Sequence, residues 1–400
     1  MDSLDQGAKG IPVSSVELKG SLLTMKVGVV GGAFSGTLGK DGETIEGTWT
    51  QAGGSLPLAL KRVKDTSALQ SPRPQEPKPP FPYRSEDLTY ENKSAGVTLA
   101  ATLTVPRGKG PFPAVVLLTG SGPQNRNEEI MGHKPFLVLA DYLTRKGIAV
   151  LRADDRGVGK SGGVFAKATT ADFAADAQAG VAFLKSRPEV NTRKIGLVGH
   201  SEGAIEAAVA ASQDPDVAFI VMMAGTAEPG GDIVVQQAQL IAQANGANPE
   251  RVKEIGKRER AIIAILQSGK SEPEMKRELR AALAGTMRES VVGAEISGLT
   301  SPWFRYFIGY NPATALRQVK CPVLAIAGSK DLQVPPKQNL DGIRAVLQQA
   351  GNRNVETVEF PGLNHLFQHA STGSPREYAE IEETLAPEVL RKVAGWILQR

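Results

Sequence analysis

The sequence predicts an α/β protein with a doubly wound, mostly parallel sheet, an inserted block of helices, and a small all-β module in front. Three observations predict this organisation. Strands and helices alternate over residues 86–400, residues 228 to about 315 have helical periodicity without a clear strand, and residues 1–64 contain only short alternating runs. Buried strands that alternate with helices are typical of a parallel sheet covered on both faces.

Length and composition agree with this organisation. The 400 residues are enough for one large core and a second small domain. The net charge of +4 comes from interspersed basic and acidic residues, so it does not favour a nucleic-acid partner. No apolar run reaches the ~18 residues that a membrane span needs. The one cysteine, Cys321, excludes an intrachain disulfide, and we expect it to be buried.

The first 64 residues are predicted to form a meander of strands, because the runs Leu22–Val27, Ala33–Leu38 and Thr44–Trp49 are separated by turn signals. A linker is predicted over residues 65–85, with six prolines between Pro72 and Pro82. Such a segment is extended and semi-rigid, which favours a spacer over the alternative, an SH3-type ligand.

The elements of the main domain, residues 86–400, follow from periodicity. The predicted strands are Gly96–Val105, Ala114–Leu118, Gly147–Arg152, Lys194–Val198, Val217–Met223, Val323–Ala327 and Val355–Phe360. The predicted helices are Phe136–Arg145 and Ala171–Ser186, followed by Asp232–Ala244, Pro249–Leu266 and Glu272–Ala284 in the inserted block. An insertion of helices between two sheet strands is expected to form a cap over the active-site end.

The most specific motif is the G-x-S-x-G pentapeptide Gly199–Gly203, which stands between a predicted strand and a run of small helix-forming residues. In that context Ser201 lies on a tight turn that exposes its hydroxyl, and the flanking glycines avoid clashes. A serine nucleophile needs a base, and the base needs an orienting acid. His365 and Asp331 each follow a predicted strand, so the order Ser201, Asp331, His365 predicts a catalytic triad, with His369 as the alternative base.

The other candidate residues complete a hydrolytic site. The backbone N–H groups of Glu202 and of Ser121, or Gly122 in its place, are predicted to hold an oxyanion. The aromatic cluster Trp303, Phe304, Tyr306, Phe307 and Tyr310 is predicted either to form an apolar wall for the substrate or to pack the cap onto the body. No histidine and cysteine cluster has metal-ligand spacing, so we expect no metal and no cofactor. His133 and His200 are not expected to act as the base, and the segment Asp154–Gly162 only imitates nucleotide-binding loops.

Four segments together make the chain from about residue 86 resemble the α/β-hydrolase superfamily, and within it a bacterial carboxylesterase group related to serine aminopeptidases and dienelactone hydrolases. These segments are Leu118–Arg126, Asp154–Ser161, Gly199–Gly203 and Asn364–His365. The resemblance implies Ser201 as nucleophile, Asp331 as acid and His365 as base. Relatives often carry an export signal, which the N-terminus of this chain does not show, so an exported full-length form stays open.

The sequence therefore predicts a serine carboxylesterase for small-molecule esters with short to medium acyl groups. A peptidase or thioesterase on the same triad is one alternative, in which a cap carboxylate such as Glu228 would bind the amino group of a substrate. A non-catalytic binding protein on a hydrolase scaffold is the other. The compartment, the oligomeric state and the natural ester do not follow from these residues.

Overall fold

The computed structural model describes residues 1, 11–28, 31–51, 54–63, 72–287 and 289–400. They form two compact units: the first ends at Pro72, and the second runs from Arg73 to Arg400, residues 130–132 excepted. In the described residues no helix is long and apolar enough to cross a membrane.

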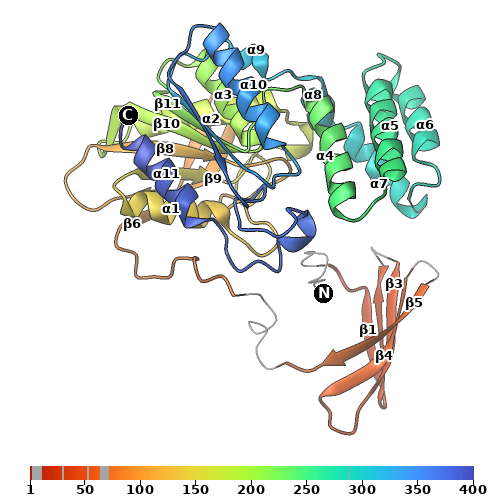
Figure 1. Cartoon of the computed structure of the whole chain (residues 1–400). Helices are drawn as coiled ribbons and strands as arrows, with labels where there is room; N and C mark the ends of the chain where they lie inside the picture. Colours follow the sequence, from red (N-terminus) through yellow and green to blue (C-terminus); the bar gives the residue numbers. More distant parts are fainter. Residues whose placement is uncertain (2–10, 29–30, 52–53, 64–71, 288) are drawn as a thin grey trace. The chain divides into compact units, whose positions relative to one another are not determined.

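The first unit is an antiparallel meander in which each strand pairs with the next (Figure 1). Its strands are β1 (Ser15–Lys19), β2 (Leu22–Val27), β3 (Gly32–Leu38), β4 (Thr44–Gln51) and β5 (Gly54–Lys61). Gly36 pairs with Gly47 across β3 and β4, and the ring of Phe34 lies against both. A Cβ at Gly36 would come within 2.6 Å of that ring, so both glycines make room for the aromatic side chain that forms the small core.

Residues 65–71 of the predicted linker lie outside the described residues. From Arg73 onward this stretch belongs to the second unit and is hydrogen-bonded to the C-terminal part of that unit. Arg73 donates from Nη1 to the carbonyl of Ile381 (2.7 Å) and from Nη2 to that of Ala379 (2.9 Å), and Gln75 Nε2 donates to Leu385 O (2.6 Å). These contacts hold the proline-rich stretch from Arg73 onward against residues 379–385 of the same unit.

The second unit is built on an eight-stranded sheet of order β13-β12-β11-β10-β8-β9-β7-β6. The six strands from β13 to β9 in that order are parallel. The last two strands of the order, β7 and β6, each pair antiparallel with their neighbours. The strands are β6 (Arg84–Asn92), β7 (Val97–Val105), β8 (Phe112–Leu118), β9 (Ala149–Ala153), β10 (Val190–His200), β11 (Phe219–Met223), β12 (Val323–Gly328) and β13 (Val355–Phe360). Each strand predicted from periodicity is present, which confirms the mostly parallel sheet.

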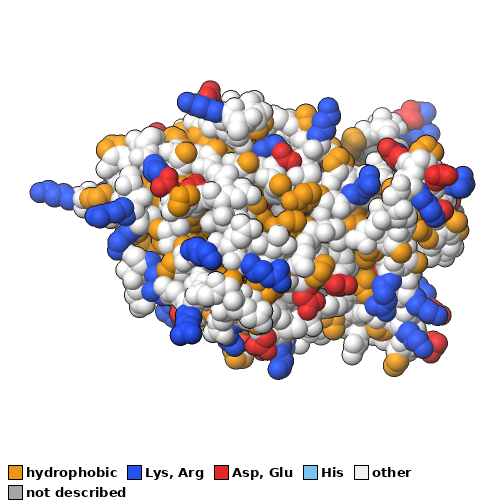
Figure 2. Space-filling model, turned by 90° about the horizontal axis from the view of Figure 1, so that it is seen from above, with side chains coloured by type: hydrophobic (Ala, Val, Ile, Leu, Met, Phe, Trp, Pro, Cys, Tyr) orange, Lys and Arg blue, Asp and Glu red, His pale blue; other side chains and the backbone are white. Residues whose placement is uncertain are grey.

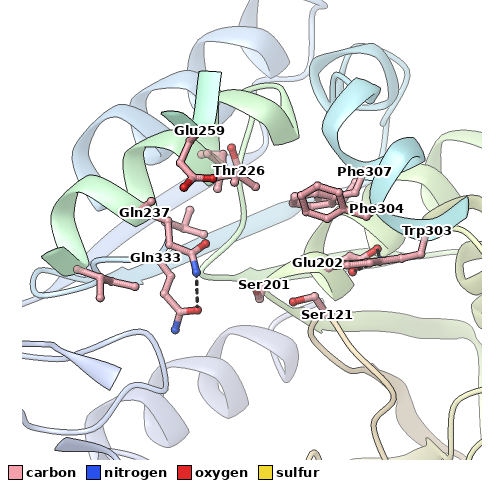
Figure 3. Close-up of a pocket in the computed structure, with 16 residues that line it drawn as sticks. Ser121, Ser201, Glu202, Thr226, Gln237, Glu259, Trp303, Phe304, Phe307 and Gln333 are labelled. Atoms are coloured by element: carbon pink, nitrogen blue, oxygen red, sulfur yellow. Dashed lines mark hydrogen bonds between the residues drawn. The ribbon is translucent and has the colours of Figure 1, made fainter. Parts of the chain in front are cut away.

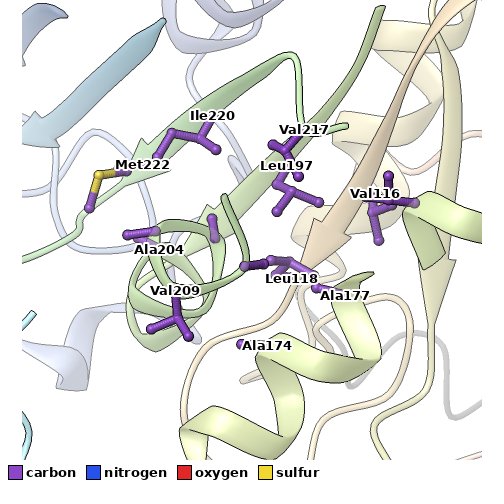
Figure 4. Close-up of a cluster of buried hydrophobic side chains, with 14 of the residues drawn as sticks. Val116, Leu118, Ala174, Ala177, Leu197, Ala204, Val209, Val217, Ile220 and Met222 are labelled. Carbon is purple, nitrogen blue, oxygen red and sulfur yellow. The ribbon is translucent and has the colours of Figure 1, made fainter. Parts of the chain in front are cut away.

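Helices cover both faces of this sheet (Figure 1). Because side chains alternate along a strand, Leu197 of β10 packs with α2 and α3, whereas Val198 packs with α1 and α11 on the opposite face. Figure 4 shows the first of these cores, between the sheet, α2 and α3. The helices of the body are α1 (Pro135–Arg145), α2 (Thr170–Lys185), α3 (Glu202–Gln213), α9 (Ala313–Leu316), α10 (Pro336–Gln349) and α11 (Pro387–Ile397), with short 3₁₀ turns η4 (Phe165–Lys167) and η5 (Pro375–Glu377).

The inserted block between β11 and β12 is helical, as predicted, and has its own core. It contains α4 (Gly230–Ala244), α5 (Pro249–Leu266), α6 (Glu272–Leu283), α7 (Glu289–Leu299) and α8 (Pro302–Gly309). Local signals set several of these boundaries. The side chain of Asn248 caps α5 by accepting from Arg251 N, and Pro249 occupies its first turn. Ser301 and Pro302 start α8 in the same way.

Candidate active site

Ser201 lies on a strained turn between β10 and α3, with φ of 54° and ψ of −116°. Its backbone N–H donates to Met223 O at 2.8 Å, which ties the turn to the end of β11. A Cβ at Gly199 would come within 2.0 Å of Gly203 O, and one at Gly203 within 2.2 Å of Leu118 O. Both glycines of the motif are therefore required by close backbone contacts. A left-handed conformation at a non-glycine residue is uncommon and is typical of functional sites.

His365 and Asp331 form a buried pair at the same edge of the sheet. Asp331 follows β12, His365 follows β13, and His365 Nδ1 lies 2.8 Å from Asp331 Oδ2. The other carboxylate oxygen, Oδ1, accepts from the N–H groups of Gln333 and Val334 at 2.8 Å each. With Asp331 ionised, the ring proton belongs on Nδ1, so Nε2 keeps its lone pair.

Ser201 and this pair lie at the same edge of the sheet because β10, β12 and β13 are parallel and their carboxyl ends share that edge. In the described part of the chain no hydrogen bond joins Ser201 Oγ to His365. In unliganded hydrolases this bond is commonly long, and it shortens when the substrate binds. The predicted residues are thus brought to one edge of the sheet.

A second charged pair lies directly behind the first. His200 Nδ1 is 2.9 Å from Glu128 Oε1, and His200 Nε2 is 3.0 Å from the carbonyl oxygen of His365. With Glu128 ionised, both ring nitrogens donate and His200 is an imidazolium. Burial by itself lowers the pKa of His200, but the Glu128 carboxylate, the His365 carbonyl and Asp331 together outweigh burial and raise that pKa above the usual value.

The loop after β8 that contains Ser121 is fixed by two carboxylates from elsewhere in the chain. Gly120 N donates to Glu128 Oε1 (2.8 Å), so Glu128 holds both this loop and His200. Asp155 accepts from Thr119 Oγ1 and from Gln124 N at 2.8 Å each. Burial raises the pKa of Asp155 to about 7, against the effect of these hydrogen bonds. The backbone N–H of Gly120 therefore already has a partner in Glu128. Ser121 lies beside Ser201 in the lining of the pocket.

The side chains above Ser201 enclose a pocket of about 380 Å³ (Figure 3). Trp303, Phe304 and Phe307 of α8 form one wall, and the Trp303 and Phe307 rings stack at 5.8 Å. The remaining lining residues are Ser121, Ser201, Glu202, Ile205, Thr226, Ile233, Val234, Gln237, Ala238, Ile241, Glu259, Gln333 and Val334. The volume is within the range of small-molecule sites.

Comparison with known proteins agrees with this geometry. A family profile described as X-Pro dipeptidyl-peptidase (S15 family) matches residues 95–365, which is more than half of the chain. The chain belongs to the S15 family. It is 28% identical over 316 residues to esterase EstD of Thermotoga maritima, covering 78% of this chain and 68% of that protein. It is also 28% identical over 180 residues to a thiohydrolase of Arthrinium phaeospermum, covering 42% of this chain and 55% of that protein.

Solved structures share the fold of this S15-family chain at low identity. The complex of DcsB with its substrate analogue matches with a TM-score of 0.50 and 19% identity, over 79% of this chain and 99% of that one. An esterase of Pyrococcus furiosus matches with a TM-score of 0.49 and 20% identity, over 80% of this chain and 91% of that one. The second unit has the α/β-hydrolase fold, with the serine on the turn that this fold uses for its nucleophile.

Glu202 has a role in this S15-family site that its sequence position does not indicate. Glu202 is the first residue of α3, so its backbone N–H has no hydrogen-bond partner within the helix. Its buried carboxylate accepts from Thr170 Oγ1 (2.6 Å) and from Trp303 Nε1 (2.8 Å). Burial raises the pKa of Glu202, although both hydrogen bonds oppose the rise. The residue after Ser201 therefore anchors the aromatic wall of the cap.

The structure separates some of the other candidates from the pocket. Tyr306 and Tyr310 stack on each other at 5.4 Å and do not belong to its lining. Glu228 accepts from Gln236 Nε2 at 2.9 Å and is also outside the lining, whereas Glu259, which the sequence analysis did not single out, is part of it.

The two remaining histidines have other partners. His133 is buried between Thr384 Oγ1 (3.0 Å) and Tyr378 O (2.8 Å), and burial lowers its pKa to about 4. His369, the alternative base, is largely exposed and pairs with Glu383 and Glu388.

In the loop Asp154–Gly162, Gly157 N donates to Gly162 O within the loop, and Gly162 N donates to Thr98 O of β7. Asp154 is held by two hydrogen bonds from the guanidinium of Arg126. Among the described residues no group of three or more potential metal ligands gathers in one place.

Proposed function

We propose that this protein is a serine carboxylesterase that cleaves small esters with short to medium acyl groups through an acyl-enzyme on Ser201. One observation carries the proposal: the strained serine opens into a pocket at the sheet edge where an imidazole is held by a carboxylate at 2.8 Å. The 28% identical Thermotoga maritima protein is named an esterase, which supports ester chemistry.

In the proposed mechanism, Ser201 Oγ attacks the ester carbonyl carbon while His365 Nε2 takes the hydroxyl proton. Asp331 stabilises the resulting imidazolium and keeps the ring oriented. The N–H groups of Ser121 and Glu202 donate to the oxyanion, and each such donor contributes about 3 kcal/mol to the transition state. His365 then protonates the leaving alcohol. Water attacks the acyl-enzyme, with His365 as base again, and releases the acid.

The test is pre-steady-state kinetics with an activated nitrophenyl ester. A burst of nitrophenol equal to the enzyme concentration is expected, together with fluorophosphonate labelling of Ser201. Ser201→Ala should abolish the label and lower kcat by several orders of magnitude. Ser121→Ala is the matched control, because it removes a second pocket hydroxyl but keeps the backbone N–H, and it should stay within a few-fold of the parent. Unchanged turnover in Ser201→Ala would refute the mechanism, and an unlabelled, inactive parent would favour the binding-protein alternative.

A second candidate is amide or thioester cleavage on the same residues. The family profile is named for a dipeptidyl-peptidase, a relative is named a thiohydrolase, and a carboxylate, Glu259, lines the pocket. Rates on matched nitrophenyl esters, thioesters and aminoacyl anilides separate the possibilities. The esterase proposal expects the ester to exceed the anilide by orders of magnitude in kcat/KM, and a preference for the anilide would reverse the assignment.

A further inference from the structure

The pocket above Ser201 has two chemically different sides. Figure 3 shows Trp303, Phe304 and Phe307 on one side, and Glu259, Gln237 and Gln333 on the other. The polar side chains come from three separate segments: Glu259 from α5, Gln237 from α4, and Gln333 from the loop just after Asp331. Helix α4 also contributes Val234, Ala238 and Ile241 to the lining, so an acyl group that fills this space meets aromatic rings on one side and a mixture of polar and apolar side chains on the other.

Glu259 presents one free carboxylate oxygen to this space. Arg258 donates from Nε (3.1 Å) and from Nη2 (2.8 Å), and both hydrogen bonds go to Oε1 of Glu259. Oε2 has no hydrogen-bond partner among the described residues, although only 17% of the Glu259 side chain is exposed. A carboxylate oxygen without a partner, on a side chain that is largely buried, gains from a donor, and each hydrogen bond to a charged group contributes about 1.5–3 kcal/mol.

The charge of Glu259 is already balanced by the adjacent guanidinium of Arg258. A ligand therefore needs to supply a hydrogen, and it does not need to supply a positive charge. Gln237 adds to this side. Its Nε2 donates to Gln333 Oε1 (3.4 Å), and Gln333 Nε2 donates to Tyr378 Oη (3.0 Å). This chain of bonds leaves the carbonyl oxygen of Gln237 as a second acceptor near Glu259.

We propose that the pocket selects esters whose acyl group ends in a hydroxyl. In this arrangement the methylene chain or ring lies against Phe304 and Phe307, and the distal hydroxyl donates to Glu259 Oε2. The inference rests on the proposed esterase function and names the substrate class of that same site. A distal ammonium group has the same donor chemistry, and the experiment separates it from the neutral hydroxyl.

The experiment measures kcat/KM for nitrophenyl esters of ω-hydroxyalkanoic acids of increasing length. Each is compared with the plain alkanoate and with the ω-ammonio ester of equal length. At the length that spans the pocket, the hydroxy ester is expected to exceed the alkanoate by about tenfold or more. Glu259→Leu should remove that preference, and a far-UV circular dichroism spectrum equal to that of the parent shows that the variant is folded. Glu259→Gln keeps a carbonyl acceptor and should retain most of the preference.

The matched control is Glu254→Leu, on the same helix. Glu254 is 60% exposed, pairs with Arg251 and is outside the lining, so its loss should leave the preference unchanged. The inference is overturned if no length shows a hydroxy preference, if Glu259→Leu keeps it, or if only the ammonio ester is preferred. Equal rates for all esters overturn this inference alone. Hydrolysis of no ester by the parent, or full activity in Ser201→Ala, overturns the proposed function and this inference with it.

Discussion

The carboxyl-end edge of the sheet and the cap both contribute residues to one pocket, and they differ in how their side chains are held. At the edge, Asp331 and His365 are 2% and 4% exposed, and Asp331 accepts three hydrogen bonds. The cap side chains Trp303, Phe304 and Phe307 are only half-buried, on a helix that belongs to an insertion. The side chains at the edge are therefore held in fixed positions, as a reaction requires, whereas the side chains of the cap form a surface that can select a ligand.

The two regions also differ in their charges. The charges at the edge are buried in pairs, as in Glu128 with His200, and removing one partner leaves the other without compensation. On the cap, positive and negative side chains are interspersed on the surface shown in Figure 2, and pairs such as Lys270 with Glu278 are exposed. Exposed pairs contribute little to stability. Substitutions at the edge should consequently have large effects on rate and stability, and substitutions on the cap small ones.

The largest effect is expected for Asp331→Asn. The amide keeps the size of the carboxylate but can donate to His365 Nδ1, which places the ring proton on Nε2 and removes the base. We expect kcat/KM for an activated ester to fall by about a thousandfold or more. Asp341→Asn, an exposed acid on α10, serves as the control and should have the parent rate. A loss of less than about tenfold would show that the carboxylate does not set the tautomer.

A smaller but pH-dependent effect is expected for Glu128→Gln. The raised pKa of His200 means that the folded state binds a proton more tightly than the unfolded state. This stabilisation is complete below about pH 6.5 and is lost as pH rises through the folded pKa. The variant should lose about 3 kcal/mol of unfolding free energy at neutral pH, as expected for a broken buried pair. The free energy of unfolding, measured with urea at several pH values, should also lose the part of its pH dependence that comes from His200. Parallel curves for variant and parent would mean that His200 is not charged.

The link between the two regions is tested by Trp303→Phe. This change keeps an aromatic ring but removes the Nε1 hydrogen that Glu202 accepts. We expect KM for medium-chain esters to rise by up to about tenfold with kcat nearly unchanged, because the wall loses its anchor while the triad is intact. Thr170→Val is the matched control, since it removes the other hydrogen bond to the same carboxylate and leaves the pocket lining alone. If KM rises equally in Trp303→Phe and Thr170→Val, the two hydrogen bonds act by holding the Glu202 side chain, and not by holding the aromatic wall of the cap.

The smallest effect is expected for Lys270→Ala on the cap. The side chains of Lys270 and Glu278 are 45% and 33% exposed, so their ion pair is well solvated. The free energy of unfolding should change by less than about 0.5 kcal/mol, and ester kinetics should not change. A loss of several kcal/mol would mean that the cap depends on its surface charges as strongly as the edge depends on its buried ones.

Local patterns were sufficient for much of the framework. The glycines around Ser201 predicted the turn because the backbone there leaves no space for a Cβ. Helix α5 has the predicted bounds, because its cap and its first-turn proline adjoin it in sequence. Asp331 and His365 were placed at one edge because parallel strands end on the same side. For Tyr306 and Tyr310 the local cluster was insufficient, since the two rings stack on each other and lie outside the pocket lining.

The sequence by itself determined the strand and helix pattern, the turn that carries Ser201, and the edge of the sheet at which Asp331 and His365 lie. These depend on hydrophobic periodicity and on steric limits that act over a few residues. Only the tertiary structure decided that Glu128 reaches His200, that Glu202 anchors Trp303, and that Glu259 joins the pocket lining. Glu128 and His200 are 72 residues apart, and Glu202 and Trp303 are 101 apart. Such contacts follow from how the helices pack on the sheet. The residues that neighbour a carboxylate in the sequence do not indicate which distant donor it will bind.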